Sequence, residues 1–228
     1  MTDKQTVCAI IVAAGSSERM NGVDKIFAPL AGKPVLARAV AAFQDSPSVD
    51  RIVLVVTEQN IEKTRQLAEE HKWSKVAEVC AGGERRQDSV AAGLSKLTGC
   101  DWVIVHDGAR PLVTADLIDR GLEAAKETGA AAAAVPVTDT IKMAMENMIV
   151  QGTPPRKSLW AVQTPQVFRS DILREAYRQM KYDVTDDATL VERAGYKVKL
   201  YMSAYDNIKI TTHEDQALAE ILVKKHGR

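Results

Sequence analysis

The chain has few cysteines, no net charge and no long apolar run, and each shortage excludes a class of protein. Cys8, Cys80 and Cys100 are too few and too widely spaced for a disulfide framework or a zinc site. Thirty basic and thirty acidic residues give a formal net charge of zero, so no overall field attracts nucleic acid or an anionic membrane. No signal-like segment begins the chain, and no apolar stretch approaches the roughly 20 residues that span a bilayer. We therefore expect a cytoplasmic protein with buried free thiols and neither nucleic-acid nor membrane partners.

Short apolar runs alternate with helical patterns along most of the chain, whose 228 residues are 46% hydrophobic. This alternation predicts an α/β fold with a mainly parallel sheet and helices on both faces, in which ligands bind at the carboxyl ends of the strands. The expected strands are 7–12, 51–57, 76–80, 102–105, 131–137 and 196–202. The expected helices are 34–44, 58–71, 87–97, 114–128, 171–180, 186–194 and 213–225.

The alternation is interrupted between Asp139 and Pro165. Residues 140–145 alternate polar and apolar side chains, and Glu146-Asn147 can form a turn, which predicts a hairpin that leaves the sheet. We expect one domain over 1–228 with an arm at about 138–160. An uncovered hairpin is only marginally stable, so we expect the arm to pack on a second copy of the chain. The alternative is a loosely tethered surface loop.

The first expected strand runs directly into Ala13-Ala14-Gly15, with Arg19 and Lys25 nearby. Small residues let the backbone approach a ligand closely, and exposed N–H groups with two cations suit a triphosphate. The segment lacks the glycines of the Walker and dinucleotide signatures, which makes a dehydrogenase a poor candidate. An ordinary strand-to-helix turn is the alternative.

Polar groups follow two more expected strands. Gly82 and Gly83 precede Ser89, and this segment can contact a nucleobase edge, although Asp88 or Ser89 can simply cap a helix. His106-Asp107 ends the strand that begins at residue 102. Magnesium can bridge such a carboxylate to phosphate oxygens, whereas the alternative is an ion pair between Asp107 and Arg110. We expect His106 to be a packed neighbour.

Lys209 lies between two isoleucines near the end of the chain. In an extended segment it points opposite to Ile208 and Ile210, so it faces a cleft if they face the core. Solubility of an edge strand is the competing explanation.

Four segments carry these candidate residues: 13–25, 82–89, the strand end at His106-Asp107, and the segment around Lys209. In their order and separations they resemble the cytidylyltransferases of the non-mevalonate isoprenoid route, which join CTP to 2-C-methyl-D-erythritol 4-phosphate. The resemblance spans nearly the whole chain. Further matching segments are 136–142, 156–160, 163–166 and 185–187. The chain departs from the family pattern at Ser17, where many members have glycine, and in a shortened stretch before Lys25. The resemblance implies a Rossmann-like nucleotidyltransferase fold with a projecting β-arm.

The resemblance also implies roles for individual residues. The backbone of Ala13, Ala14 and Gly15 would hold the triphosphate, and Gly83, Glu84 and Ser89 would surround the cytosine. Arg19, Lys25 and Lys209 would be catalytic through their positive charge. Asp107 would hold Mg²⁺ or another divalent cation. The residues expected to bind the acceptor are Asp107, Arg110, Thr140, Arg156, Thr164, Thr185 and Asp206.

In this family the arms of a homodimer are exchanged, so Thr140 and Arg156 would reach the acceptor in the partner subunit's site. The chemistry would be in-line attack of an acceptor phosphate oxygen on the α-phosphorus of CTP, with pyrophosphate leaving. A cytidylyltransferase for another polyol phosphate, such as ribitol 5-phosphate, is the nearest alternative. An alternative of another class is a non-catalytic nucleotide-binding regulator.

Overall fold

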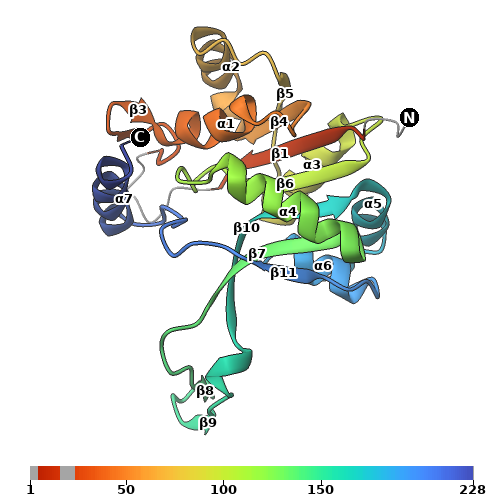
Figure 1. The fold of residues 1–228 in the computed structure, drawn as a ribbon, viewed down its shortest axis with the longest axis vertical. Coiled ribbons are helices and arrows are strands. Elements are labelled where there is room, and N and C mark those ends of the chain that lie inside the picture. The colour runs from red at the N-terminus through yellow and green to blue at the C-terminus, as the bar shows by residue number, and fades with distance from the viewer. Residues whose placement is uncertain (1–4, 16–23, 228) are drawn as a thin grey trace.

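The computed structural model describes residues 5–15 and 24–227. Its centre is a seven-stranded, mainly parallel sheet in the order β11-β7-β10-β6-β1-β4-β5 (Figure 1), which confirms the predicted fold class. The strands of this sheet are β1 (Val7–Ala13), β4 (Arg51–Val56), β5 (Val76–Ala81), β6 (Trp102–Asp107), β7 (Ala130–Pro136), β10 (Trp160–Arg169) and β11 (Lys199–Met202). The short strands β2 (Pro29–Leu30) and β3 (Lys33–Pro34) pair with each other outside it.

The strand order reverses beside β1. The chain proceeds from β1 to β4 and β5 on one side, and returns to place β6 on the other side of β1. All four strands are parallel, so their carboxyl ends share one edge of the sheet. In open α/β sheets ligands bind at such a reversal.

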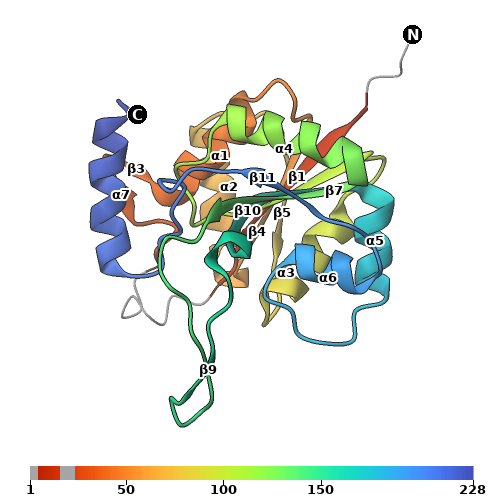
Figure 2. The ribbon, with the colours of Figure 1, turned by 60° about the horizontal axis from the view of Figure 1, so that its bottom comes forward.

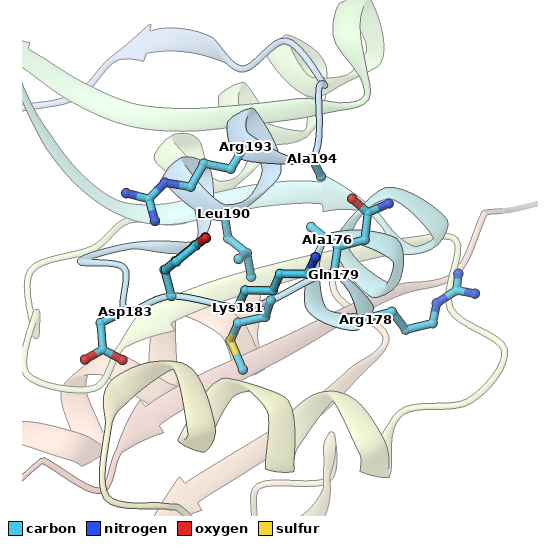
Figure 3. Close-up of a pocket in the computed structure, with 10 residues that line it drawn as sticks. Ala176, Arg178, Gln179, Lys181, Asp183, Leu190, Arg193 and Ala194 are labelled. Atoms are coloured by element: carbon cyan, nitrogen blue, oxygen red, sulfur yellow. The ribbon is translucent and has the colours of Figure 1, made fainter.

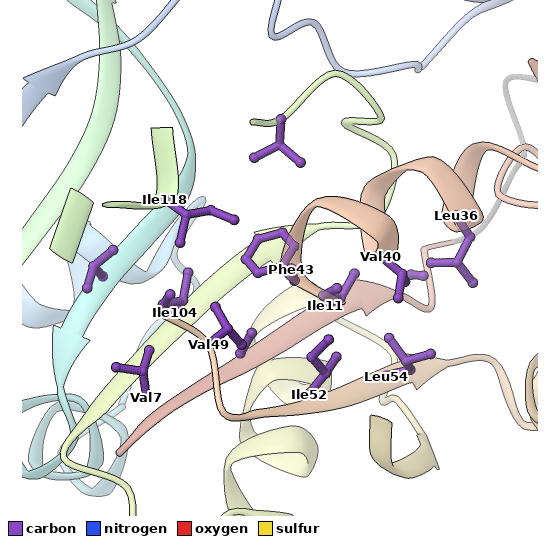
Figure 4. Packing of buried hydrophobic residues seen from close by; sticks show 14 of the residues in the cluster. Val7, Ile11, Leu36, Val40, Phe43, Val49, Ile52, Leu54, Ile104 and Ile118 are labelled. Atoms are coloured by element: carbon purple, nitrogen blue, oxygen red, sulfur yellow. The ribbon is translucent and has the colours of Figure 1, made fainter. Parts of the chain in front are cut away.

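Helices cover both faces of the sheet. Helices α1 (Val35–Asp45), α2 (Ile61–Glu70) and α4 (Ala115–Thr128) pack on one face, and α3 (Arg86–Lys96), α5 (Ser170–Arg178) and α6 (Asp187–Arg193) pack on the other. Because side chains alternate along a strand, Ile11 belongs to the first core (Figure 4) and Ile10 to the second. None of the helices in the described ranges is long and apolar enough to cross a membrane.

The last helix, α7 (His213–Lys225), lies beside β3 (Figure 2) and packs on a separate apolar cluster that includes Leu30, Leu112 and Ile210. Two short 3₁₀ turns complete the described elements: η2 (Glu58–Asn60) leads into α2, and η3 (Arg156–Ser158) precedes β10. The predicted helices and strands are confirmed to within a few residues at their ends.

Strand β10 is missing from the sequence-based prediction. It is antiparallel to both β6 and β7, so Gln166 pairs with Val105 on one side and with Ala132 on the other. Pro165 interrupts its apolar pattern, and a proline argues against an interior strand because it cannot donate a backbone hydrogen bond. The structure accommodates Pro165 at an irregularity in the register between Val162 and Gln166.

The predicted hairpin is present and projects far from the sheet (Figures 1 and 2). Its strands β8 (Met143–Ala144) and β9 (Val150–Gly152) are antiparallel, and Glu146-Asn147 forms the turn. Its apolar side chains are exposed, with Met148 at 82% of its full accessible surface.

The expectation of three free thiols is wrong for two of them. Cys8 and Cys100 form a disulfide, with their Cα atoms 6.1 Å apart, whereas Cys80 is free and buried. The two cysteines are separated by 92 residues in the sequence. Pairing of β1 with β6 sets Cys8 opposite Val103, which brings the segment before β6 close to Cys8. The wide spacing of the cysteines along the chain therefore did not exclude a disulfide.

Candidate functional site

A cavity of about 120 Å³ lies at the carboxyl ends of β1, β5 and β6, beside the strand-order reversal. It gathers residues that the sequence placed in four separate blocks. The predicted residues that line it are Ala13, Ala14, Gly15, Lys25, Gly83, Glu84, Ser89, Asp107 and Lys209. Its other lining residues are Val12, Ile26, Arg85, Arg86 and Ala109.

Two glycines let the loops around the cavity approach closely. A Cβ atom at Gly82 would lie 2.5 Å from both Ala14 Cβ and Ser89 Oγ, and one at Gly108 would lie 3.0 Å from Ala13 Cβ. Distances near 2.5 Å are too short for carbon contacts, so a side chain at Gly82 would push the β5–α3 loop away from the β1 loop.

Ser89 and Asp88 stabilise the loop that enters α3. The Ser89 hydroxyl, which is buried, accepts a hydrogen bond from the Gly83 N–H at 3.2 Å. The residue at the N-cap of α3 is Arg85, and Asp88, at the third helical position, completes a capping box because its carboxylate accepts from the Arg85 N–H. Neither Asp88 nor Ser89 is the N-cap residue itself; Asp88 contributes to capping through its side chain, while Ser89 both lines the cavity and orders its loop.

Three cations surround the Asp107 carboxylate at the floor of the cavity. Arg86 Nε lies 3.0 Å from Oδ1, Lys209 Nζ lies 2.9 Å from Oδ2, and Arg110 Nε lies 3.7 Å from Oδ2. Burial alone would raise the pKa of Asp107, but the charges of Arg86, Lys209 and Arg110 outweigh it and hold that pKa well below its usual range. Asp107 is therefore a fixed negative charge, and its predicted pairing with Arg110 is present.

The segment around Lys209 is not a strand, yet the predicted orientation holds. Ile210 is buried in the cluster beneath α7, and Lys209 faces the cavity and Asp107. Its partner is a buried carboxylate, which argues against solubility as the reason for this lysine.

His106 and Thr164 hold Asp107 from behind. His106 Nε2 lies 3.1 Å from the Arg110 carbonyl oxygen, so this nitrogen carries the proton and donates. The Thr164 hydroxyl lies 3.1 Å from the other ring nitrogen and accepts from the Asp107 N–H at 3.0 Å. Burial lowers the pKa of His106 to about 4, which agrees with a neutral ring, and the ring packs on Phe43 as a core neighbour.

The sequence-based reasoning gave no role to Arg86 or Asp187. Arg86 Nη1 donates to Asp187 Oδ2 at 2.8 Å, and the Tyr177 hydroxyl donates to Asp187 Oδ1 at 2.6 Å. Burial and the Asp187 charge both raise the pKa of Tyr177, which stays protonated and donates. Two consecutive arginines, separated from Gly82-Gly83 by Glu84, were the only local signal for Arg86.

Several predicted residues do not line this cavity. Thr140, Arg156 and Thr185 are exposed, and Arg156 Nη1 donates to the Thr138 carbonyl oxygen on the arm. Asp206 instead pairs with His226 Nε2 at 2.7 Å. Thr164 is buried behind Asp107. Arg19 and Ser17, together with most of the shortened stretch before Lys25, lie outside the described residues.

The family model for 2-C-methyl-D-erythritol 4-phosphate cytidylyltransferase matches residues 7–225. The chain belongs to this family. An enzyme of that name from Dehalococcoides mccartyi (strain 195) is 55% identical over 221 residues, covering 97% of each chain. One from Caldanaerobacter subterraneus subsp. tengcongensis is 44% identical over 225 residues, covering 96% of this chain and 99% of its own.

Solved structures agree with the family assignment. The crystal structure of 4-diphosphocytidyl-2C-methyl-D-erythritol synthase from Anaerococcus prevotii matches with a TM-score of 0.87 and 28% identity, covering 97% of each chain. That of 2-C-methyl-D-erythritol 4-phosphate cytidylyltransferase from Thermus thermophilus matches with a TM-score of 0.76 and 32% identity, covering 94% of this chain and 98% of its own. The chain is thus a nucleotidyltransferase of the cytidylyltransferase type, as its sequence predicted.

The described residues form no group of three or more histidine, cysteine or carboxylate side chains that could hold a metal ion. The cavity offers the carboxylate of Asp107 at its floor. Magnesium sites on nucleotides use one or two carboxylates together with substrate phosphates and water. The donor set therefore fits an ion that arrives with a triphosphate.

A larger cavity of about 900 Å³ lies between α5 and α6 and contains none of the predicted site residues. In Figure 3 the side chains of Arg178 and Arg193 extend toward opposite sides, so these cations do not converge on a common point. Convergent polar groups are what orient a small ligand. The smaller cavity, which Lys25, Lys209 and Asp107 line, is therefore the better candidate for a ligand site.

Proposed function

We propose that this chain transfers CMP from CTP to 2-C-methyl-D-erythritol 4-phosphate, giving 4-diphosphocytidyl-2-C-methyl-D-erythritol and pyrophosphate. Family membership supports this activity. The observation in the structure that carries it is the joining of three strand-end loops, Lys25, Lys209 and the buried Asp107 around one cavity. Backbone donors and converging cations of this kind suit a triphosphate.

Within this cavity the nucleotide binds between two loops. The backbone of Ala13, Ala14 and Gly15 holds the triphosphate at the end of β1. Gly83, Glu84 and Ser89 surround the cytosine, and the hydrogen bond from Gly83 to Ser89 keeps their loop in place. A cytosine edge held against this ordered loop would have its polar atoms satisfied, and we propose that these contacts favour CTP.

The reaction is an in-line displacement. A phosphate oxygen of the acceptor forms a bond to the α-phosphorus of CTP while the bond from that phosphorus to the pyrophosphate oxygen breaks. The acceptor phosphate is already anionic near neutral pH, so the step needs no general base. In this proposal the positive charges of Lys25, Lys209 and Arg19 stabilise the negative charge that develops on the phosphoryl oxygens.

A divalent cation, Mg²⁺ in our proposal, would bind Asp107 together with phosphate oxygens of CTP. When bound it neutralises phosphate charge. Asp107 is suited to this role because its low pKa keeps it ionised and because Thr164 and His106 fix its backbone. Lys209 forms an ion pair with the Asp107 carboxylate, and we propose that it also contacts the incoming phosphates.

We propose that the acceptor is bound partly by a second subunit. In this chain Arg110 contacts Asp107 at the cavity floor, Asp206 lies three residues before Lys209 in the sequence, and Thr185 precedes α6. Thr140 and Arg156 belong to the projecting arm, whose exposed apolar side chains suit exchange with a partner arm in a homodimer. Thr164 acts through Asp107, because its own hydroxyl is buried. We also propose one nucleotidyltransferase domain over 1–228 and a cytoplasmic location.

The deciding experiment measures pyrophosphate release with Mg²⁺, each of the four nucleoside triphosphates and a panel of polyol phosphates. We expect release with CTP and 2-C-methyl-D-erythritol 4-phosphate. Preference for ribitol 5-phosphate would reassign the acceptor, and nucleotide binding without release under any combination would identify a regulator. The absence of both binding and release would refute the proposal.

A further inference from the structure

Arg86 connects the floor of the cavity to two helices on one face of the sheet. It is the first residue of α3, and its guanidinium donates to Asp107 at 3.0 Å and to Asp187 at 2.8 Å. Asp187 begins α6, and its second carboxylate oxygen accepts from the hydroxyl of Tyr177 near the end of α5. One side chain thus joins the ends of α3, β6 and α6.

The buried carboxylates leave Arg86 little freedom. The Asp187 side chain is 1% exposed and the Asp107 side chain 9%. A buried charge that loses its partner is costly, so Arg86 cannot turn toward one carboxylate without destabilising the other. Its third nitrogen, Nη2, is buried and has no hydrogen-bond partner within the described ranges. Its orientation therefore depends on these two carboxylates.

The cations around Asp107 approach different oxygens. Arg86 is on Oδ1, whereas Lys209 and Arg110 are on Oδ2. A planar guanidinium directs its N–H groups in fixed directions, while an ammonium is a rotatable point charge. Arg86 is accordingly suited to set the direction in which this carboxylate faces the nucleotide.

We infer that Arg86 is a positioning residue for nucleotidyl transfer, held in place by Asp187 and Tyr177, and that it fixes the Asp107 carboxylate beneath the reacting phosphates. This inference rests on the proposed function, because it takes Asp107 to act on the nucleotide. Helices α5 and α6 thereby support the site from outside the cavity. Small displacements of a reacting group can lower turnover by about a hundredfold.

The test is a double-mutant cycle in kcat. We expect Arg86→Met to lower kcat about a hundredfold and Arg86→Lys to lower it about tenfold, because lysine restores the charge without the fixed geometry. Tyr177→Phe should lower kcat about threefold in the wild-type background and have no further effect beside Arg86→Met. KM for CTP should change less than kcat, since none of the residues proposed to hold the triphosphate or the cytosine is replaced.

Each result decides for or against the inference. A folded Arg86→Met enzyme with kcat within about threefold of wild type would overturn it. So would a Tyr177→Phe effect of equal size in both backgrounds, because a purely structural hydrogen bond adds independently of Arg86. If Arg86→Met fails to fold, Arg86→Lys serves as the second background.

A matched control removes a similar ion pair elsewhere. Arg169 binds Asp171 through two nitrogens at the exposed start of α5, so Arg169→Met should leave kcat unchanged. The wild-type enzyme separates the two proposals. If it releases no pyrophosphate from CTP with the acceptor, the proposed function fails; if it is active while the cycle is additive, only the inference about Arg86 fails.

Discussion

Asp107 and His106 are neighbours in the sequence, yet the fold gives them opposite environments. Asp107 faces three cations and stays ionised, while His106 faces the Arg110 carbonyl oxygen and Thr164 and stays neutral. Because side chains alternate along β6, one points toward the cavity and the other into the core against Phe43. We therefore expect substitutions of Asp107 to affect catalysis and substitutions of His106 to affect stability.

Lys25 lines the cavity and should act mainly on the transition state. We expect Lys25→Ala to lower kcat at least about a hundredfold while CTP still binds, because the lost charge matters most as charge develops at the α-phosphorus. Arg19→Ala should behave alike. A pyrophosphate-release assay measures kcat, and isothermal titration calorimetry measures CTP binding. The control is Lys126→Ala, which removes an exposed lysine on α4. Near-normal turnover of Lys25→Ala would remove this lysine from the proposed role.

His106 should make the protein less stable in mild acid. Its folded pKa of about 4 lies below the ordinary value of 6.5, so between these values the unfolded chain binds a proton that the folded chain does not. Stability is therefore full above about pH 6.5 and falls as the pH drops toward 4, by roughly 3 kcal/mol at most.

Urea unfolding at about pH 7 and about pH 4.5 measures this effect. His106→Gln keeps a donor for the Arg110 carbonyl oxygen and has no titrating ring, so it should lose less stability than wild type between the two pH values. Equal losses in both proteins would assign the acid sensitivity to other groups.

At the scale of elements, the cavity depends on close contact between the loop after β1 and the loop from β5 to α3. Gly82→Ala introduces a Cβ 2.5 Å from Ala14 Cβ and Ser89 Oγ. We expect a rise of at least about tenfold in KM for CTP, since the loops must separate, with the fold retained. Steady-state kinetics and a thermal melt measure these two properties.

The double variant Gly82→Ala with Ala14→Gly gives the matched test of that contact. It removes one of the two opposing atoms, so part of the CTP affinity should return. A Gly82→Ala enzyme with unchanged KM would show that the two loops adjust without cost.

Strand β10 shows where local pattern fails for an element. Its ten residues include Pro165 and three exposed residues at the start, so neither alternation nor a continuous apolar run identifies it. The strand forms because β6 and β7 present unpaired edges that its backbone satisfies. Strand β1 is the opposite case, since its uninterrupted apolar run is required by burial on both faces.

At the scale of the whole molecule, the Cys8–Cys100 disulfide closes a long loop that contains most of β1 and all of β4 and β5. Reduction should lower the free energy of unfolding by about 2–4 kcal/mol, because a crosslink over 92 residues restricts the unfolded chain. Urea midpoints with and without reductant measure the change. The Cys100→Ser variant should respond to reductant much less, and an equal response would contradict a role for this disulfide.

The projecting arm predicts shared active sites. Mixed dimers of Arg156→Ala and Lys25→Ala subunits should recover up to about a quarter of wild-type activity, because one site in some dimers then receives an intact arm and an intact Lys25. Each parent alone should be nearly inactive. Verified mixed dimers without recovery would place each site within one chain.

Hydrophobic periodicity was sufficient to identify the alternating strands and helices and the arm, because the burial of one face is a local demand, and residue types at the strand ends identified the blocks that line the cavity. It could not identify the partners of Arg86, since Asp187 is 101 residues away. It also missed β10 and the Cys8–Cys100 pair, which exist because the sheet brings distant segments side by side. The amino-acid sequence alone determined the fold class and which candidate residues stand at the strand ends, because both depend on local chemistry. The orientation of Asp107 was decided only by the tertiary structure, because folding brings the charges of its partners within about 4 Å of its carboxylate.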